Sequence, residues 1–146
     1  MANSYKIKIA IGFVSIIAFL AFSSNSLYAQ KKKEIRAAAV SSKQEWNHIY
    51  TNDTEKKYLE AEYQYDKRGN TLLEKLYDEN GNIIKHTEFK YNADGNEILE
   101  ISYNPKGQII EKIETTYYKE DLKLEKKVYG ANGKLKSKKI FEYKTF

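Results

Sequence analysis

Apolar and polar residues alternate along the chain from about residue 57 to the end, with the two-residue period of a β-strand. Tyrosine recurs through this region at seven positions: Tyr65, Tyr77, Tyr91, Tyr103, Tyr117, Tyr129 and Tyr143. The intervals alternate between 12 and 14 residues, which makes a 26-residue internal repeat with two unequal halves. We therefore expect one strand for each tyrosine, alternately short and long.

Turn chemistry explains where these strands end. Five of the tyrosines are followed by a four-residue segment whose last residue is glycine: Gly69, Gly81, Gly95, Gly107 and Gly133. The segment begins with Asp or Asn in four of the five cases, and such a side chain can accept hydrogen bonds from the backbone of the turn. Glycine at the fourth position takes the left-handed conformation that closes a type I turn with a bulge. The segments therefore predict β-hairpin loops.

Strand parity predicts which side chains share a face. Because 12 and 14 are both even, all seven tyrosines are expected on one side of the sheet. The same count places a set of apolar residues on that side: Leu59, Tyr63, Leu73, Ile83, Phe89, Leu99, Ile101, Ile109, Ile113, Leu135 and Phe141. The opposite side is expected to be polar: Glu62, Glu74, His86, Glu88, Glu100, Lys112, Glu114, Lys126 and Lys138. The tyrosine ladder would then be either a buried core, covered by residues such as Trp46 and Ile49, or an open binding platform.

The first segment has the pattern of an export signal. Lys6 and Lys8 lead into an apolar run of 14 residues, 9–22, and a polar stretch then ends at Ala29. The run is shorter than the ~20 apolar residues that a membrane span needs. We expect cleavage after Ala29, no membrane span in the cleaved protein, and a periplasmic, outer-surface or secreted location.

Together these patterns predict an all-β fold. We expect an antiparallel up-and-down meander of about seven to eight strands, forming a single curled sheet or a partial barrel. The predicted organisation is a signal peptide over residues 1–29, a linker or short helix over 30–43, and a β-repeat domain over 44–146. Residues 44–51 alternate well enough to add an eighth strand before the repeats.

Composition excludes several classes of function. The formal net charge of +5 falls to 5 − 2 = +3 when Lys6 and Lys8 leave with the signal, and acidic residues are interleaved with the remaining lysines. We therefore predict no nucleic-acid partner, since that would need basic residues clustered on one side. The chain has no cysteine, which excludes disulfides, a thiol nucleophile, zinc–thiolate sites and a lipid anchor on cysteine. No cofactor or metal site is predicted.

Candidate catalytic residues are scarce, and no serine-hydrolase, zinc-protease or phosphate-loop motif occurs. Glu88 and Glu100 are expected to face each other on the polar side, where they could act as the carboxylate pair of a glycosidase or simply belong to a charged surface. His86 is expected on the same side as an exposed polar residue. The acidic segment 78–82 has some features of a calcium loop, but turn chemistry accounts for it.

Two segments resemble the YD repeats of the Rhs family, whose signature is Tyr-x-Tyr-Asp-x-x-Gly: Tyr63-Gln64-Tyr65-Asp66-Lys67-Arg68-Gly69-Asn70 and Phe89-Lys90-Tyr91-Asn92-Ala93-Asp94-Gly95-Asn96. The resemblance covers about residues 57–146. It implies an exported or surface-associated protein with repeats wound into β-sheet, of a kind often linked to carbohydrate or cell-surface binding. Seven strands cannot enclose a toxin as the long Rhs shells do, so toxin delivery is not implied. The chain looks more like the small exported YD-like proteins of Gram-negative Bacteroidota, for which the repeat implies no chemistry.

The leading functional hypothesis is a non-enzymatic binding or structural module, acting in the periplasm or at the cell surface on a protein or glycan partner. Two alternatives stay open: a glycan-binding protein that uses the tyrosine platform, and a small exported glycoside hydrolase. An open tyrosine face would favour binding, whereas a concave site with two carboxylates would favour hydrolysis.

Export predicts the N-terminus of the native protein. We expect the protein purified from its host to begin at Gln30 and to be found outside the cytoplasm. Intact-mass and N-terminal peptide mass spectrometry of the fractionated cells measures both properties. Recovery of the protein with Met1 still attached would contradict the prediction.

Overall fold

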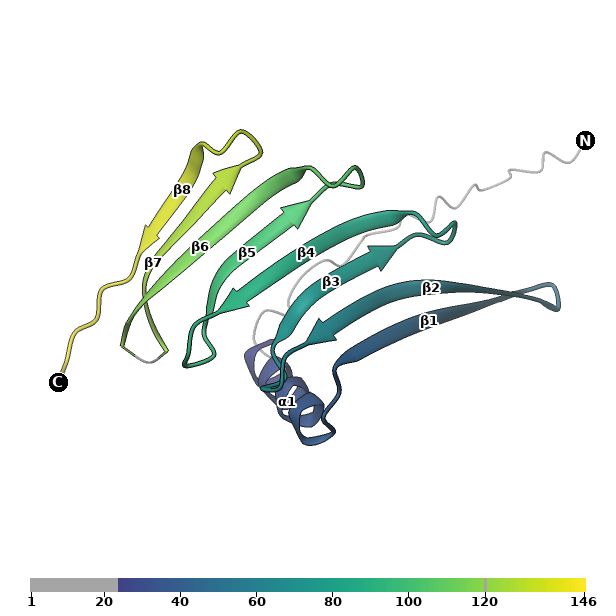
Figure 1. Cartoon of the computed structure of the whole chain (residues 1–146), viewed down its shortest axis with the longest axis horizontal. Helices are drawn as coiled ribbons and strands as arrows, with labels where there is room; N and C mark the ends of the chain where they lie inside the picture. The colour runs from purple at the N-terminus through teal and green to yellow at the C-terminus, as the bar shows by residue number, and fades with distance from the viewer. Residues whose placement is uncertain (1–23, 120) are drawn as a thin grey trace, which may run out of the picture.

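The computed structural model describes residues 24–119 and 121–146, so residues 1–23 of the predicted signal peptide lie outside the described part. The described strands form one antiparallel sheet, in which every strand pairs with its neighbours along the chain (Figure 1). The topology is an up-and-down meander of eight strands that stays open rather than closing into a barrel. The predicted fold class is confirmed.

The strands follow each other at short intervals: β1 (Ser42–Thr51), β2 (Thr54–Tyr65), β3 (Thr71–Tyr77), β4 (Ile83–Tyr91), β5 (Glu97–Tyr103), β6 (Ile109–Lys119), β7 (Leu122–Gly130) and β8 (Leu135–Ile140). The helix α1 (Ser24–Ala37) precedes them. The strand predicted at 44–51 is therefore β1, and the segment predicted as linker or short helix is helical as far as Ala37. β1 and β8 are the two edges of the sheet.

The sheet is a single layer, and few of its side chains are fully buried. Within the described part of the chain, the buried apolar residues are Ala61 and Tyr65, which are 1% and 7% exposed. Most other apolar side chains are half-buried, and several are open to solvent. Contacts between neighbouring strands and within the hairpin loops must therefore supply much of the stability.

The hairpin loops have the predicted chemistry. In the first loop, Asp66 Oδ1 accepts hydrogen bonds from the backbone N–H groups of Arg68 (2.8 Å) and Asn70 (2.9 Å), and Asp66 Oδ2 accepts one from Asn70 Nδ2 (2.7 Å). Asp78, Asn92 and Asn104 begin their loops in the same way. The expected left-handed conformation is found at all five loop glycines, with φ between 72° and 88°: Gly69, Gly81, Gly95, Gly107 and Gly133.

Each of these loops is followed by one extra residue on the outgoing strand. Gln64 pairs with Leu73 and Tyr65 pairs with Thr71, so Leu72 is left between them without a partner on β2. The same register shift recurs after the later hairpin loops and at the β6–β7 connection, where the unpaired residues are Ile84, Ile98, Ile110, Leu124 and Lys136. These positions are β-bulges, which bend and twist the strand that carries them.

The bulges correct the prediction that all tyrosines share one face. We call the side of the sheet that carries Tyr65 face A and the opposite side face B. Every bulge shifts the inside–outside alternation by one residue, so the tyrosines of successive strands point to opposite faces. Face A carries Tyr65, Tyr91 and Tyr117, and face B carries Tyr77, Tyr103 and Tyr129. Tyr143 follows β8 in the chain.

The same shift divides the residues that parity had grouped. Among the predicted apolar set, Tyr63, Phe89 and Ile113 lie on face A, whereas a larger group lies on face B: Leu59, Leu73, Ile83, Leu99, Ile101, Ile109 and Leu135. Glu74, Glu100 and Lys126, predicted on the polar side, share face A with Tyr65. Both faces are therefore mixed in character.

Trp46 does not cover the tyrosines of face A. It pairs with Leu59 on face B, where it is 48% exposed and Lys57 Nζ lies 4.6 Å from the centroid of its ring. Face A is instead covered in part by α1. The helix is rich in Ala, Lys, Glu and Arg, which favour helical structure, and it ends where Ala39 takes a left-handed φ of 51° and Val40 N–H bonds to Ile35 O at 3.1 Å.

α1 packs against the first hairpin loop at Gly69. A Cβ atom added to Gly69 would meet the carbonyl oxygen of Lys32 and would lie 3.1 Å from the backbone nitrogen of Arg36. At Gly81, whose φ is nearly the same, an added Cβ would meet nothing within 4 Å. The two loops are thus alike in backbone geometry and differ in whether a helix rests on them.

This difference predicts unequal effects of the same substitution. Gly81→Ala should destabilise the protein by about 1–2 kcal/mol through the left-handed φ alone. Gly69→Ala should cost a further ~1–3 kcal/mol because the new methyl group displaces α1. Urea denaturation followed by circular dichroism measures both free energies of unfolding, and equal losses in the two variants would mean that α1 does not pack on this loop.

Candidate functional site

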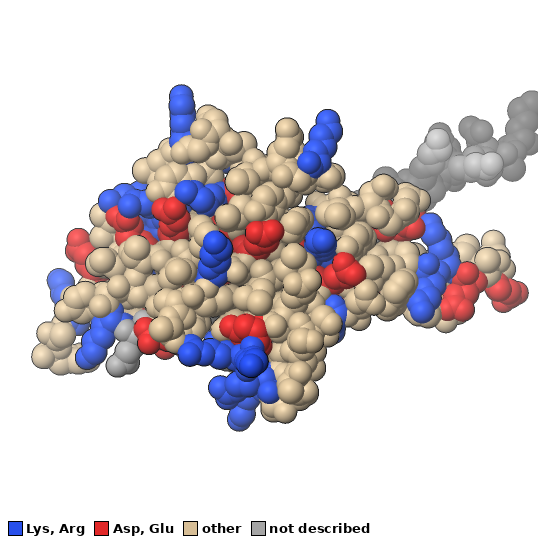
Figure 2. Space-filling model, viewed as in Figure 1, with Lys and Arg blue, Asp and Glu red and all other residues tan. Residues whose placement is uncertain are grey.

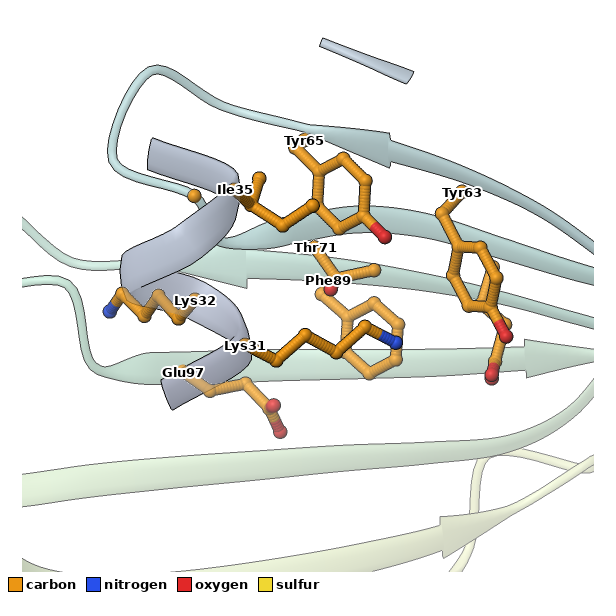
Figure 3. Close-up of a pocket in the computed structure, with 10 residues that line it drawn as sticks. Lys31, Lys32, Ile35, Tyr63, Tyr65, Thr71, Phe89 and Glu97 are labelled. Carbon is orange, nitrogen blue, oxygen red and sulfur yellow. The ribbon is translucent and has the colours of Figure 1, made fainter. Parts of the chain in front are cut away.

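The candidate site is a cavity of about 370 Å³ between α1 and face A of the sheet (Figure 3). Strands β2 to β5 form its floor and the helix forms one wall. The residues that line it come from these two sources: Lys31, Lys32 and Ile35 from α1, and Tyr63, Tyr65, Gly69, Thr71, Glu74, Phe89 and Glu97 from the sheet and its first loop.

The bulges explain why these side chains meet. Tyr63 and Glu74 are directly paired across β2 and β3, although parity had placed them on opposite faces. Glu97 pairs with Tyr91 on the same face, one position before the bulge at Ile98. Without the extra residue at Leu72, Glu74 would point away from the ring of Tyr63, whereas Glu97 is held on the face of the rings by its direct pairing with Tyr91.

Figure 3 shows how the helix contributes to the cavity. Lys31 extends from α1 toward the rings of Phe89 and Tyr63, while Lys32 points outward. Ile35 lies beside the ring of Tyr65, which is the most buried tyrosine of the repeat positions. Lys31 Nζ is 4.9 Å from the centroid of the Tyr63 ring, a distance at which the cation is attracted to the π-system.

Burial changes the ionisation of two groups at the cavity. Burial raises the pKa of Tyr63 to about 12, and the nearby carboxylates of Glu45 and Glu74 act in the same direction. Burial also raises the pKa of Glu97, assisted by the charge of Glu100 and opposed by two lysines. Glu74 is held by an ion pair with Lys85 at 2.6 Å. The cavity thus combines the rings of Tyr63, Tyr65 and Phe89 with the cation of Lys31 and the carboxyl groups of Glu74 and Glu97.

The tyrosine ladder has a regular pattern of hydroxyl contacts outside this cavity. On face B, each hydroxyl donates to a glutamate fifteen residues earlier: Tyr77 to Glu62 (2.5 Å), Tyr103 to Glu88 (3.1 Å) and Tyr129 to Glu114 (3.0 Å). The hydroxyls of the other three tyrosines each donate to a backbone carbonyl twenty residues earlier: Tyr91 to Thr71 (2.8 Å), Tyr117 to Glu97 (2.9 Å) and Tyr143 to Lys123 (2.8 Å). These six tyrosines are half-buried or exposed, and their hydroxyls tie each strand to the one before it.

The predicted carboxylate pair does not form. Glu88 pairs with Ile101 on face B, whereas Glu100 pairs with Phe89 on face A, so the two side chains stand on opposite sides of the sheet. This prediction was wrong for the same reason as the prediction for the tyrosines, because the alternation of faces was counted straight through the bulge at Ile98. A carboxyl pair is instead brought into one cavity by Glu74 and Glu97, which the sequence pattern had not connected.

The remaining candidates have structural partners. His86 is half-buried rather than exposed: its ring stacks on Tyr103 with centroids 4.8 Å apart, and its Nε2 lies 3.4 Å from Glu88 Oε1. Both carboxylate oxygens of Asp78 accept hydrogen bonds within the loop, from the backbone of Asn80 and from Asn82. Over residues 24–119 and 121–146, no group of three or more His, Cys, Asp or Glu side chains is arranged to hold a metal ion.

Comparisons with known proteins add little to this description. No protein-family model matches the chain, and no curated protein matches it. Among solved structures, the chain is similar to a DUF3836 family protein from Parabacteroides distasonis ATCC 8503, with 13% sequence identity and a TM-score of 0.36. That match covers 68% of this chain and 90% of the other. The described part of the chain contains no helix with the length and apolar character to cross a membrane.

The face B contacts predict a dependence of stability on pH. The Tyr77 hydroxyl, and then the Gln44 amide, hold the pKa of Glu62 below its ordinary value of 4.5, so this pair contributes stability that is present above that pH and is lost as the pH falls below it. Tyr77→Phe should lower the free energy of unfolding at pH 7 by about 1 kcal/mol, a modest amount because the pair is partly solvated. The difference in the free energy of unfolding between this variant and the parent should shrink on acidification.

The control for this prediction is Tyr118→Phe, because Tyr118 is 72% exposed. Burial, reinforced by Glu62, also raises the pKa of Tyr77 to about 12, so the same contact should persist up to pH 10 and fail as the pH rises through 12. Urea unfolding at several pH values measures the loss of stability at low pH, and ultraviolet titration measures the ionisation of the tyrosine phenols at high pH. A Tyr77→Phe variant that matches the control at every pH would refute the role given to this pair.

Proposed function

We propose that the protein is an exported, non-catalytic binding module that acts outside the cytoplasm, with the cavity beneath α1 as its ligand site. The observation that carries the proposal is the composition of this cavity, in which the rings of Tyr63 and Phe89 stand beside charged groups on an otherwise open sheet. Binding sites for small ligands commonly combine apolar walls with a few polar groups that fix orientation. The export pattern of residues 1–29 supports the location.

A sugar is the ligand class that suits this cavity best. Aromatic rings offer flat apolar surfaces to the C–H faces of a sugar, while Lys31, Glu74 and the phenol of Tyr63 offer donors and acceptors to its hydroxyl groups. The volume of about 370 Å³ lies within the range usual for ligand cavities. The glycan hypothesis therefore moves from a tyrosine platform, which the alternating faces break up, to this cavity.

One observation favours a second candidate function, glycoside hydrolysis. Glu97 has a raised pKa and shares the cavity with Glu74. A carboxyl group with a raised pKa holds its proton to a higher pH and can donate it to a glycosidic oxygen while a second, ionised carboxylate assists. Under this candidate, Glu97→Gln would abolish the release of reducing sugar and leave binding in place.

The binding proposal predicts the effect of removing one ring. Tyr63→Ala should weaken binding to a polysaccharide retained by the parent protein by about tenfold, which corresponds to ~1.4 kcal/mol. Affinity electrophoresis through gels containing neutral polysaccharides identifies the ligand, and calorimetry measures the affinity. Tyr118→Ala removes an exposed tyrosine from outside the cavity and should bind like the parent.

Two results would overturn this assignment. Unchanged affinity in a folded Tyr63→Ala variant would mean that the ligand binds elsewhere. Shortening of the polysaccharide during incubation with the parent protein, lost in Glu97→Gln, would replace the binding module with the hydrolase.

A further inference from the structure

Positive charge is concentrated at the end of the sheet formed by β7 and β8. Residues 121–146 contain eight lysines and three acidic residues, whereas residues 57–120 contain nine basic and thirteen acidic residues, so acidic residues are not evenly interleaved with lysines along the repeats. All six residues of β8 are exposed. Figure 2 shows lysine side chains standing out at this end of the molecule.

The strand register places these lysines directly opposite one another. Lys127 pairs with Lys138 on face B, and Lys126 pairs with Lys139 on face A. Like charges at directly opposed positions destabilise an antiparallel pair, because their side chains are only ~5 Å apart at Cβ. An anion placed between each pair would remove this repulsion.

Face B has such an anion in the protein itself. Glu125 lies between Lys127 and Lys138 and forms ion pairs with both, the first at 2.5 Å. Face A has no equivalent: among the described residues, neither Lys126 nor Lys139 has an ion-pair partner. Lys139 instead lies over the ring of Phe141, 5.0 Å from its centroid. The two lysines on face A are therefore not bridged by an ion pair as those on face B are, and the acidic group that acts on Lys126 is the carboxyl group of Glu97.

Protection of an edge strand does not account for this pair. Lysines on β8 discourage the edge from pairing with another chain, but Lys126 lies on β7, which is an interior strand. Lys123 lies on the same face of β7, where it pairs with Tyr117. Both lysines act on the carboxyl group of Glu97 and favour its ionised form, which shows that their field extends over face A.

We propose that face A of β7 and β8 binds an acidic polysaccharide, whose carboxylate, phosphate or sulfate groups bridge Lys126 and Lys139. The proposal rests on the binding-module function above and adds a class of partner at a second surface. A chain suits this face better than a flat lipid surface does. α1 stands on the same face over β2 to β5, and a helix is ~10 Å thick, so a bilayer would meet the helix first.

The test compares two double variants with equal charge. Lys126→Gln with Lys139→Gln removes the unbridged pair on face A, and Lys127→Gln with Lys138→Gln removes the pair that Glu125 neutralises on face B. The protein, expressed from its full-length gene and purified, is titrated with polygalacturonate at several salt concentrations. Dextran, duplex DNA and phosphatidylcholine vesicles with 30% phosphatidylglycerol serve as the other probes.

We expect the parent protein to bind polygalacturonate in a salt-dependent manner and not to bind dextran through this face. The face A variant should bind at least fivefold more weakly, and the face B variant should stay within twofold of the parent. Polygalacturonate should also raise the Tm of the parent and not of the face A variant. The face A variant without ligand should melt no lower than the parent, because a repulsion has been removed.

Several results would overturn the proposal. They are no binding of polygalacturonate by the parent, equal losses in the two double variants, or tighter binding to DNA or to the anionic vesicles than to polygalacturonate. The face A variant also separates this proposal from the cavity, because its binding of the neutral polysaccharide retained by the parent should match that of the parent. If the parent binds polygalacturonate but no neutral polysaccharide, the cavity assignment fails and the lysine surface stands.

Discussion

One extra residue after each hairpin loop governs the arrangement of side chains on this sheet. The loop holds its own geometry, because an Asp or Asn side chain accepts backbone N–H groups and a left-handed glycine closes the turn. The outgoing strand then carries an unpaired residue such as Leu72. Each bulge exchanges the two faces of the following strand, so a repeat of even length produces tyrosines on both sides.

The tyrosine hydroxyls compensate for the thin core that this arrangement leaves. Their contacts recur at intervals of fifteen and twenty residues, each time joining a strand to the preceding one. Such contacts are local in sequence, and each unit touches only its neighbours. Stability in a sheet of this kind is close to a sum of unit and interface contributions, as in other repeat proteins. Individual positions are then free to differ between units.

The two proposed binding surfaces use that freedom at opposite ends of the array. Near the start, the loop glycine Gly69 has α1 packed on it, and the helix converts an open face into a cavity. Near the end, Lys139 occupies the repeat position that Ala61 occupies in the first repeat and Thr87 in the second. Lys139 pairs with Lys126. Similar backbone units therefore present an aromatic cavity at one end and a basic surface at the other.

The sequence by itself determined the strands, their order and the chemistry of their loops, because these depend on alternation and on turn residues that act within a few positions of one another. Most of the candidate site could not be read in this way. The face on which Glu74 lies depends on the bulge at Leu72, which is visible only in the register between two strands. Counting alternate residues without this bulge assigns the wrong face to the residues that follow it on the strand. Lys31 and Ile35 join the cavity only because α1 folds back onto Gly69, a contact between segments more than thirty residues apart that no local pattern encodes.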